Sequence, residues 1–209
     1  MFVGVYYNEL KNSVHLIGDT FMEKELNSFS RGLRDGIPIC LGYLSVAFAF
    51  GIFTVGHGLT IWEAVMISMT NVTSAGQLAA VPIIAGGGSL FELALTQFVI
   101  NMRYSLMSVS LSQRLSKSVR LLDRFLISFV NTDEVFAVAI SKNAPLGRKY
   151  LYGLTLTPYL GWSAGTLLGS AAGNILPATV VSALGIAIYG MFIAIIVPPA
   201  KKSLPTLLC

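Results

Sequence analysis

Apolar and polar positions divide the chain into a polar beginning and a series of apolar runs. Residues 1–35 mix charged, polar and apolar residues, and from residue 36 onward six apolar segments follow. These are 36–55, 61–84, 89–112, 122–141, 150–171 and 176–199. A helix crosses the hydrocarbon of a bilayer with about 20 apolar residues. We therefore expect an all-α integral membrane protein with a polar N-terminal segment over 1–35 and a membrane domain over 36–209.

Composition supports this class. Only 11% of the residues are charged and 54% are hydrophobic, with a mean hydropathy of +0.71, whereas soluble domains carry roughly 25% charged residues. The first 35 residues lack the apolar core of a secretory signal peptide. In a membrane protein the placement of positive charges is more informative than their total, so the net charge of +4 does not indicate nucleic-acid binding.

The basic residues gather at particular connections. They precede the first segment, fill the connection between the third and fourth, and follow the fourth and sixth, whereas the other connections hold no Lys or Arg. Cytoplasmic loops carry the excess of Lys and Arg. All the basic clusters share one side only if segments 61–84 and 122–141 each enter and leave the membrane on the same face. The pattern predicts that these two segments are broken or re-entrant, and six plain spans are the alternative.

Small polar residues interrupt segment 61–84 near its middle. Within "TNVTSAGQLAA" stand Thr73, Ser74, Gly76 and Gln77. Ser, Thr and Asn compete for backbone hydrogen bonds and favour helix ends, and Gly permits unwinding. A helix that begins here would offer free N–H groups to an anion such as a substrate carboxylate. The alternative is packing, because small residues let two helices approach closely.

The third apolar segment carries a charge about halfway along. It contains Asn101, Arg103 and Tyr104, and an arginine at a helix centre costs roughly 2.5–3.5 kcal/mol on insertion scales. Such a charge faces the protein interior, and its chemically sensible partners are Asp133, Glu134 or a substrate carboxylate. A purely structural ion pair is the alternative. Asn101 and Tyr104, about one turn apart, would line the same cavity.

The fourth apolar segment contains two adjacent carboxylates, Asp133 and Glu134. Neighbouring helix positions point about 100° apart, so we expect one to face Arg103 and the other a cavity. A desolvated carboxylate can exchange protons near neutral pH, as a proton-coupled carrier needs, or it can hold a substrate ammonium group. The alternative is an interfacial pair, with Asn131 and Thr132 capping a helix that starts at Asp133.

Glycines recur every four residues in the fifth segment, at 161, 165, 169 and 173. This spacing places them on one side of a helix and predicts close helix packing, or a face where a partner docks. Cysteines and histidines are isolated in the sequence, so we expect neither metal nor cofactor. The sequence shows no His-Glu-x-x-His, aspartate pair on separate spans or convincing Ser–His pair, and we expect no enzymatic activity.

Four sequence blocks, in their order and spacing, resemble the AzlC/YgaZ family of branched-chain amino acid permeases. The blocks are "GLRDGIPICLGYLSVAFAFGI" (32–52), "SAGQLAA" (74–80), "NMRYSLMSVSL" (101–111) and "TDEVFA" (132–137). The resemblance implies a multi-pass protein of the bacterial inner membrane. It also implies export of valine, leucine, isoleucine and similar apolar amino acids, together with a small membrane subunit of the AzlD/YgaH type.

Two features depart from the family pattern. The polar N-terminal segment is longer than in that pattern, and a new apolar run begins after Lys202 and stops at Cys209, like the start of a further span. On the leading hypothesis the protein is a secondary transporter of branched-chain amino acids, with methionine and proton coupling as open possibilities. The competing hypothesis is a non-transporting subunit or scaffold that uses the glycine face for docking.

The transporter hypothesis assigns a role to each group of polar residues. The substrate carboxylate would meet Thr73, Ser74 and Gly76, or Arg103. The substrate ammonium would meet one of the two carboxylates of the fourth segment, and an apolar pocket would hold the side chain.

Overall fold

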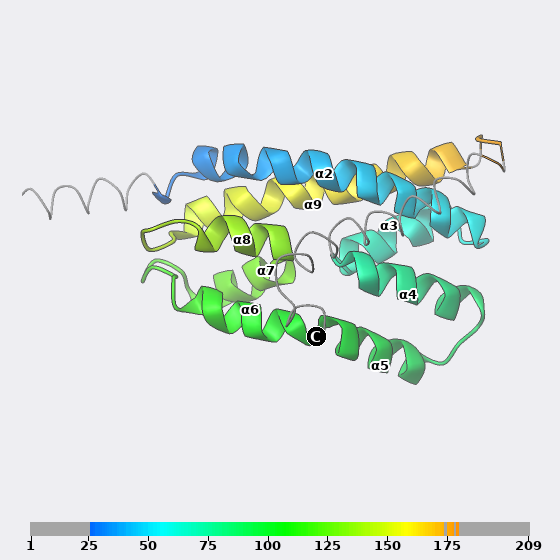
Figure 1. Ribbon diagram of the computed structural model, residues 1–209, viewed down its shortest axis with the longest axis horizontal. Helices are drawn as coiled ribbons and strands as arrows, with labels where there is room; N and C mark the ends of the chain where they lie inside the picture. The colour runs from blue at the N-terminus through cyan, green and yellow to red at the C-terminus, as the bar shows by residue number, and fades with distance from the viewer. Residues whose placement is uncertain (1–25, 174, 178, 180–209) are drawn as a thin grey trace, which may run out of the picture. The chain divides into compact units, whose positions relative to one another are not determined.

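The computed structural model describes residues 26–173, 175–177 and 179, so most of the expected segment 176–199 and most of the polar N-terminal segment lie outside the described residues. Within them the chain forms eight helices and one isolated β-bridge (Figure 1). The all-α prediction is thereby confirmed. The helices are α2 (Phe29–Gly56), α3 (Ile61–Thr70), α4 (Ser74–Ala85), α5 (Leu90–Asn101), α6 (Arg103–Ser112), α7 (Leu121–Phe129), α8 (Asp133–Ile140) and α9 (Arg148–Gly173).

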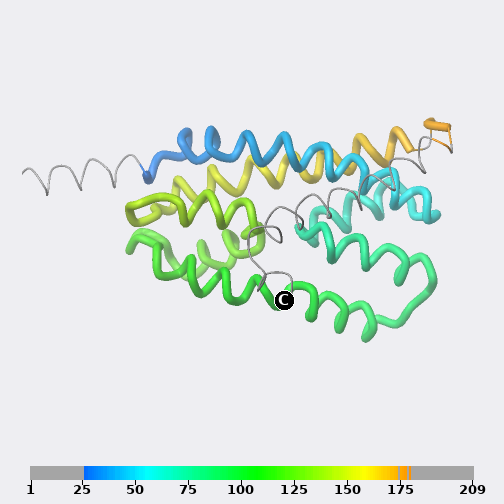
Figure 2. The backbone as a smooth tube through the Cα atoms, in the orientation of Figure 1, coloured from blue at the N-terminus to red at the C-terminus, as the bar shows by residue number. Residues whose placement is uncertain are grey.

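The chain divides into two compact units, and Figure 2 shows the course of the backbone coloured by residue number. The α7–α8 unit contains the start of α2 up to Ile39 and residues Met102–Tyr159, with α6, α7, α8 and the beginning of α9. The α3–α4 unit contains Cys40–Asn101 and the described residues from Leu160, with the rest of α2, then α3, α4, α5 and the rest of α9. Each long helix thus contributes one part to each unit.

Helix α2 is long and apolar enough to cross a bilayer by length and composition. It begins at Phe29 rather than at residue 36, so its first turns carry Arg31, Arg34 and Asp35. The sequence pattern placed these charged residues outside the helix. They extend it because a helix remains favourable wherever its charged side chains find partners or water.

In the α3–α4 unit, the glycine face of α9 packs directly against α2. A Cβ on Gly161 would lie 2.6 Å from the Cys40 Sγ and 2.7 Å from the Cys40 carbonyl oxygen, so only glycine fits. The predicted packing face is therefore confirmed. Because α2 already covers it, this face is not open to a partner, and the docking alternative is wrong. The neighbouring pairs are Gly161–Cys40, Gly165–Leu44, Gly169–Phe48 and Gly173–Ile52.

Residue numbers in these pairs rise together, so α2 and α9 run in the same direction. The α7–α8 unit repeats the arrangement, since Gly32 of α2 lies against Tyr150 and Gly36 lies against the Leu154 carbonyl oxygen. Backbone-to-backbone contact of this kind is what small residues allow in membrane helices. The two long helices are therefore parallel neighbours in both units.

Both predicted breaks are present. Residues 71–73 separate α3 from α4, and residues 130–132 separate α7 from α8. The four helices have 10, 12, 9 and 8 residues, which corresponds to about 12–18 Å each at 1.5 Å per residue. None of these helices alone matches a hydrocarbon thickness of about 30 Å. The third segment is also interrupted, between α5 and α6, but Met102 keeps a helical backbone there (φ −55°, ψ −34°).

Within the α7–α8 unit, the connection after α6 is tied to the connection after α8. The Ser116 N–H donates to the Leu146 carbonyl at 2.9 Å, and the Leu146 N–H donates to the Arg114 carbonyl at 2.8 Å. Nearby, the Lys149 N–H donates to Oδ1 of Asn27, just before α2, at 2.9 Å. The two basic connections therefore lie together, at the starts of α2 and α9.

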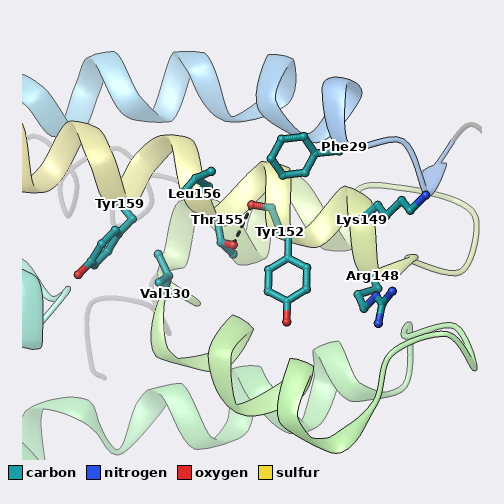
Figure 3. Close-up of a pocket in the computed structure, with 8 residues that line it drawn as sticks. All are labelled: Phe29, Val130, Arg148, Lys149, Tyr152, Thr155, Leu156 and Tyr159. Atoms are coloured by element: carbon teal, nitrogen blue, oxygen red, sulfur yellow. Dashed lines mark hydrogen bonds between the residues drawn. The ribbon is translucent and has the colours of Figure 1, made fainter.

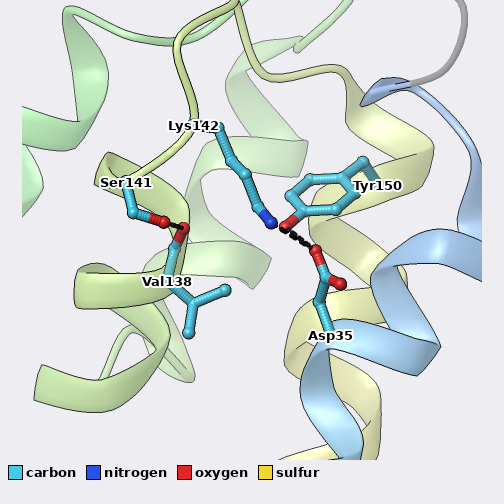
Figure 4. Close-up of polar contacts among 5 residues, drawn as sticks. All are labelled: Asp35, Val138, Ser141, Lys142 and Tyr150. Atoms are coloured by element: carbon cyan, nitrogen blue, oxygen red, sulfur yellow. Dashed lines mark hydrogen bonds and ion pairs between the residues drawn. The ribbon is translucent and has the colours of Figure 1, made fainter.

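An ion-pair clamp fixes the end of α8 in the same unit (Figure 4). Lys142 Nζ lies 2.7 Å from Asp35 Oδ2, and the Tyr150 O–H donates to the same oxygen at 2.8 Å. Lys142 also stands 5.9 Å from the centre of the Tyr150 ring. Because Asp35 belongs to α2 and Tyr150 to α9, the clamp ties the chain after α8 to both long helices.

Candidate functional site

The break in the α3–α4 unit is organised around an amide that the sequence analysis did not single out. Gln97 of α5 accepts a hydrogen bond from Asn71 Nδ2 at 2.9 Å and a longer one from Asn101 Nδ2 at 3.3 Å. Its own Nε2 donates to the Gly76 carbonyl at 2.8 Å. A Cβ on Gly76 would lie 2.6 Å from Gln97 Oε1 and from Thr73 Cγ2. Glycine at this position thus lets Gln97 reach the first turn of α4.

Gln77 lies in a second polar group of this unit and is fully buried. Its Nε2 donates to Ser68 Oγ at 2.9 Å, and Ser68 Oγ lies 2.6 Å from Thr166 Oγ1, with all three side chains excluded from solvent. Gln77 Oε1 has no hydrogen-bond partner. The group joins α4 to α3 and α9, which fits the packing alternative for Gln77. The buried Gln77 Oε1 remains an acceptor without a donor.

Thr73 and Ser74 mark the start of α4. Thr73 is the N-cap residue with an extended backbone (φ −147°, ψ 118°), and its side chain makes no capping hydrogen bond. Buried helix starts leave backbone N–H groups that need partners. The helix terminus required by the carboxylate hypothesis is therefore present at Thr73, Ser74 and Gly76.

In the α7–α8 unit, the predicted pairing of Arg103 with a carboxylate is confirmed for Asp133. An Arg103 Nη lies 2.8 Å from Asp133 Oδ2, and the two side chains are 53% and 48% exposed. Arg103 also donates to the Tyr104 hydroxyl at 3.1 Å and covers the Tyr104 ring at 4.9 Å. The charge of Glu134 acts on Arg103 as well. This ion pair connects α6 to α8 and leaves both charges half exposed.

The break in this unit buries an amide without a partner. Asn131 is 4% exposed, and neither its Oδ1 nor its Nδ2 has a hydrogen-bond partner. Thr132 occupies the N-cap position of α8, yet its side chain makes no capping hydrogen bond, so the predicted capping role of both side chains is not observed. A buried polar group without a partner costs roughly 1–3 kcal/mol of folding free energy. Asn131 therefore lowers the stability of the folded protein at this position.

The two breaks share a pattern that the sequence analysis missed. "ISMTN" at 67–71 recurs as "ISFVN" at 127–131; Thr132 directly follows the second, and Thr73 follows the first after one intervening valine. The helix before each break also starts alike, because the Thr60 N–H donates to Glu63 Oε2 at 2.7 Å and the Arg120 N–H donates to Asp123 Oδ2 at 2.8 Å. A helix, a break at Asn and Thr, and a second helix therefore occur twice.

The described residues form an all-α protein with one helix, α2, long and apolar enough to cross a membrane and three shorter apolar helices, a composition that fits the class of α-helical membrane proteins. Family comparison places it more narrowly. The AzlC protein family matches residues 38–176, and the chain belongs to this family. The resemblance predicted from the four sequence blocks is confirmed.

Individual relatives agree with this family. The inner membrane protein YgaZ of Escherichia coli (strain K12) is 31% identical over 183 residues, which cover 84% of this chain and 74% of the relative. A membrane protein of Archaeoglobus fulgidus is 33% identical over 175 residues, covering 83% and 76%. The branched-chain amino acid transport protein AzlC of Bacillus subtilis is 22% identical over 176 residues, covering 80% and 68%. No solved structure matches the chain. The predicted location in the cell membrane is confirmed.

Proposed function

We propose that the protein is a secondary transporter that exports branched-chain or similar apolar L-amino acids, valine, leucine, isoleucine and methionine among them. A small membrane subunit of the AzlD/YgaH type would act with it, and protons would serve as the coupling ion. The observation that carries this proposal is the repeated broken helix with polar side chains at each break. Transporters bind substrates at discontinuous helices, where helix ends and polar groups replace water around the substrate. Transport, and not catalysis, accounts for this arrangement.

The direction of the helices supports two re-entrant hairpins. Helices α2 and α9 run in the same direction, so on a topology in which both cross the membrane the chain between them would cross an odd number of times. The bridge of Leu115 to Leu146 brings the two ends of the α7–α8 hairpin together, which supports the proposal that this hairpin enters and leaves the membrane on one side. One of the two remaining segments would then cross, and α5–α6 is the better candidate because Met102 is helical.

This topology places every basic cluster of the described residues on one side, as the positive-inside tendency requires. The α3–α4 hairpin then enters from outside and the α7–α8 hairpin from inside. The order α2, α3, α4 and the order α5–α6, α7, α8 would then form two repeats of opposite orientation, each a crossing segment followed by a broken hairpin. Repeats of this kind, with a broken helix in each, are a common plan of secondary transporters.

We assign the polar ends of the substrate to the two breaks. The carboxylate would accept hydrogen bonds at the start of α4, from Thr73 and Ser74. The ammonium would exchange places with Arg103 beside Asp133, which is half exposed and already paired with that arginine, or beside Glu134, whose charge also acts on Arg103. Gln77, Asn101 and Tyr104 would complete the lining.

Flux measurements test this function. The full chain, reconstituted with its small subunit in vesicles, should move labelled leucine and valine above the rate of empty vesicles. Asp133→Asn should lower the flux at least tenfold, because it removes the charge that faces Arg103, whereas Glu92→Gln in the exposed first turn of α5 should leave it unchanged. If the small subunit binds and no apolar amino acid moves, the protein is a non-transporting subunit instead.

A further inference from the structure

The α7–α8 unit contains a cavity of about 740 Å³ that the transport proposal does not use. It lies between the first turns of α9, the start of α2 and the end of α7, as Figure 3 shows. The lining residues are Phe29, Val130, Arg148, Lys149, Tyr152, Thr155, Leu156 and Tyr159.

The two ends of this cavity differ in polarity. Arg148 and Lys149 stand together at one end, and Leu156 and Tyr159 lie towards the other (Figure 3). From residue 148 to residue 159 a helix rises about 16 Å, which is about half the thickness of a bilayer hydrocarbon core. The cavity therefore has a cationic end and an apolar body on the scale of one lipid leaflet.

The cationic end retains a surplus of positive charge. The nearby carboxylate, Asp123, accepts hydrogen bonds from the Tyr152 O–H at 2.6 Å and from the Arg120 N–H at 2.8 Å. Neither Arg148 nor Lys149 forms an ion pair with any residue that the structure describes. Asp123 thus stands near Arg148 and Arg120, and the described residues that line the cavity include a further cation, Lys149, and no carboxylate.

The body of the cavity continues into an exposed apolar surface. Phe29 and Leu156 are each 41% exposed, and the adjacent Phe129 is 50% exposed. In a membrane protein such a surface meets acyl chains. The cationic end is at the start of α9, next to the bridged basic connections, where the headgroup region of the cytoplasmic leaflet would lie.

We propose that this cavity is a binding site for an anionic phospholipid of the cytoplasmic leaflet. The phosphate would lie between Arg148 and Lys149, and one acyl chain would run past Leu156 to Tyr159. Basic pockets between membrane helices on the cytoplasmic side suit anionic headgroups. An apolar amino acid leaves most of this length empty, whereas a lipid matches both the charge and the length. The proposal depends on the membrane location and not on transport.

Thermal unfolding of the full chain in detergent tests the headgroup. Phosphatidylglycerol should raise the melting temperature, because a ligand of the native state stabilises it, and phosphatidylcholine with the same acyl chains should not. Arg148→Gln with Lys149→Gln should require about tenfold more phosphatidylglycerol for the same rise, since each cation near a lipid surface adds to anionic lipid binding. Arg114→Gln with Lys117→Gln, an equal charge change on the neighbouring connection, should keep the wild-type response.

Several results would overturn the proposal. These are an equal shift with phosphatidylcholine, an equal loss in both double variants, or a full shift with soluble glycerol phosphate, which would indicate a phosphate site without a lipid. Lys149→Gln alone provides a milder variant if the double variant does not fold. A photo-crosslinking residue at Leu156 identifies the occupant directly: attachment to lipid supports the proposal, and attachment to a protein chain excludes it.

Discussion

Gly76 is the residue on which the shape of the first break depends most closely. Gln97 reaches the Gly76 carbonyl only because no side chain stands between them. The same amide accepts from Asn71 and Asn101, so one side chain holds the end of α3, the start of α4 and the end of α5. Asn101 Oδ1 in this network is buried and has no hydrogen-bond partner, so the arrangement depends on the three hydrogen bonds of Gln97.

Replacing Gly76 with alanine should therefore disturb the network. The new Cβ would fall 2.6 Å from Gln97 Oε1, and overpacking of this kind costs about 1–3 kcal/mol. We expect a lower melting temperature of the purified protein and a loss of amino acid flux.

Gly42→Ala is the matched control, because a Cβ at Gly42 meets no atom within 4 Å. Alanine in a helix is favoured over glycine by up to about 1 kcal/mol, so the control should be neutral or slightly stabilising. Equal melting temperatures for the two variants would contradict the role given to Gly76.

At the scale of elements, the sequence predicted the two breaks well and their partners poorly. Asn, Thr and Gly between apolar runs are local indications of helix ends, and both breaks were found from them. Gln97 looked like a single polar residue in an apolar helix, because its contacts come from residues that are 21 and 26 positions away. The extension of α2 to Phe29 was missed for a related reason: Asp35 finds its partners in Lys142 and Tyr150.

The clamp at the end of α8 gives an element-scale prediction. Lys142→Met should lower the free energy of unfolding by about 1–3 kcal/mol, because Asp35 loses a charged hydrogen-bond partner beside Tyr150. The melting temperature in detergent measures the effect. Lys117 is an exposed lysine of the neighbouring connection, and Lys117→Met should change the melting temperature little. If both substitutions lower the melting temperature equally, the effect comes from the loss of a positive charge and not from the ion pair with Asp35.

At the scale of the whole molecule, the topology is open to direct measurement. With Cys40 and Cys209 replaced by serine, single cysteines at Lys117 and Asn143 should react with a membrane-impermeant reagent from the cytoplasmic side only. Single cysteines at His57 and Ser89 should both react from the outer side only. If the cysteines at 117 and 143 are labelled from opposite sides, α7–α8 crosses the membrane. This result would contradict the proposed pair of repeats with opposite orientation.

The tight seam between α2 and α9 has a consequence for any conformational cycle. Glycine backbones meet the facing helix at regular steps of four residues, so a shift by one residue would bring side chains against positions that have no room for them. The two helices therefore cannot slide along each other within either unit. Within each unit the contact between the two long helices is therefore fixed, and on the proposed function any motion of a transport cycle is expected at the two helix breaks.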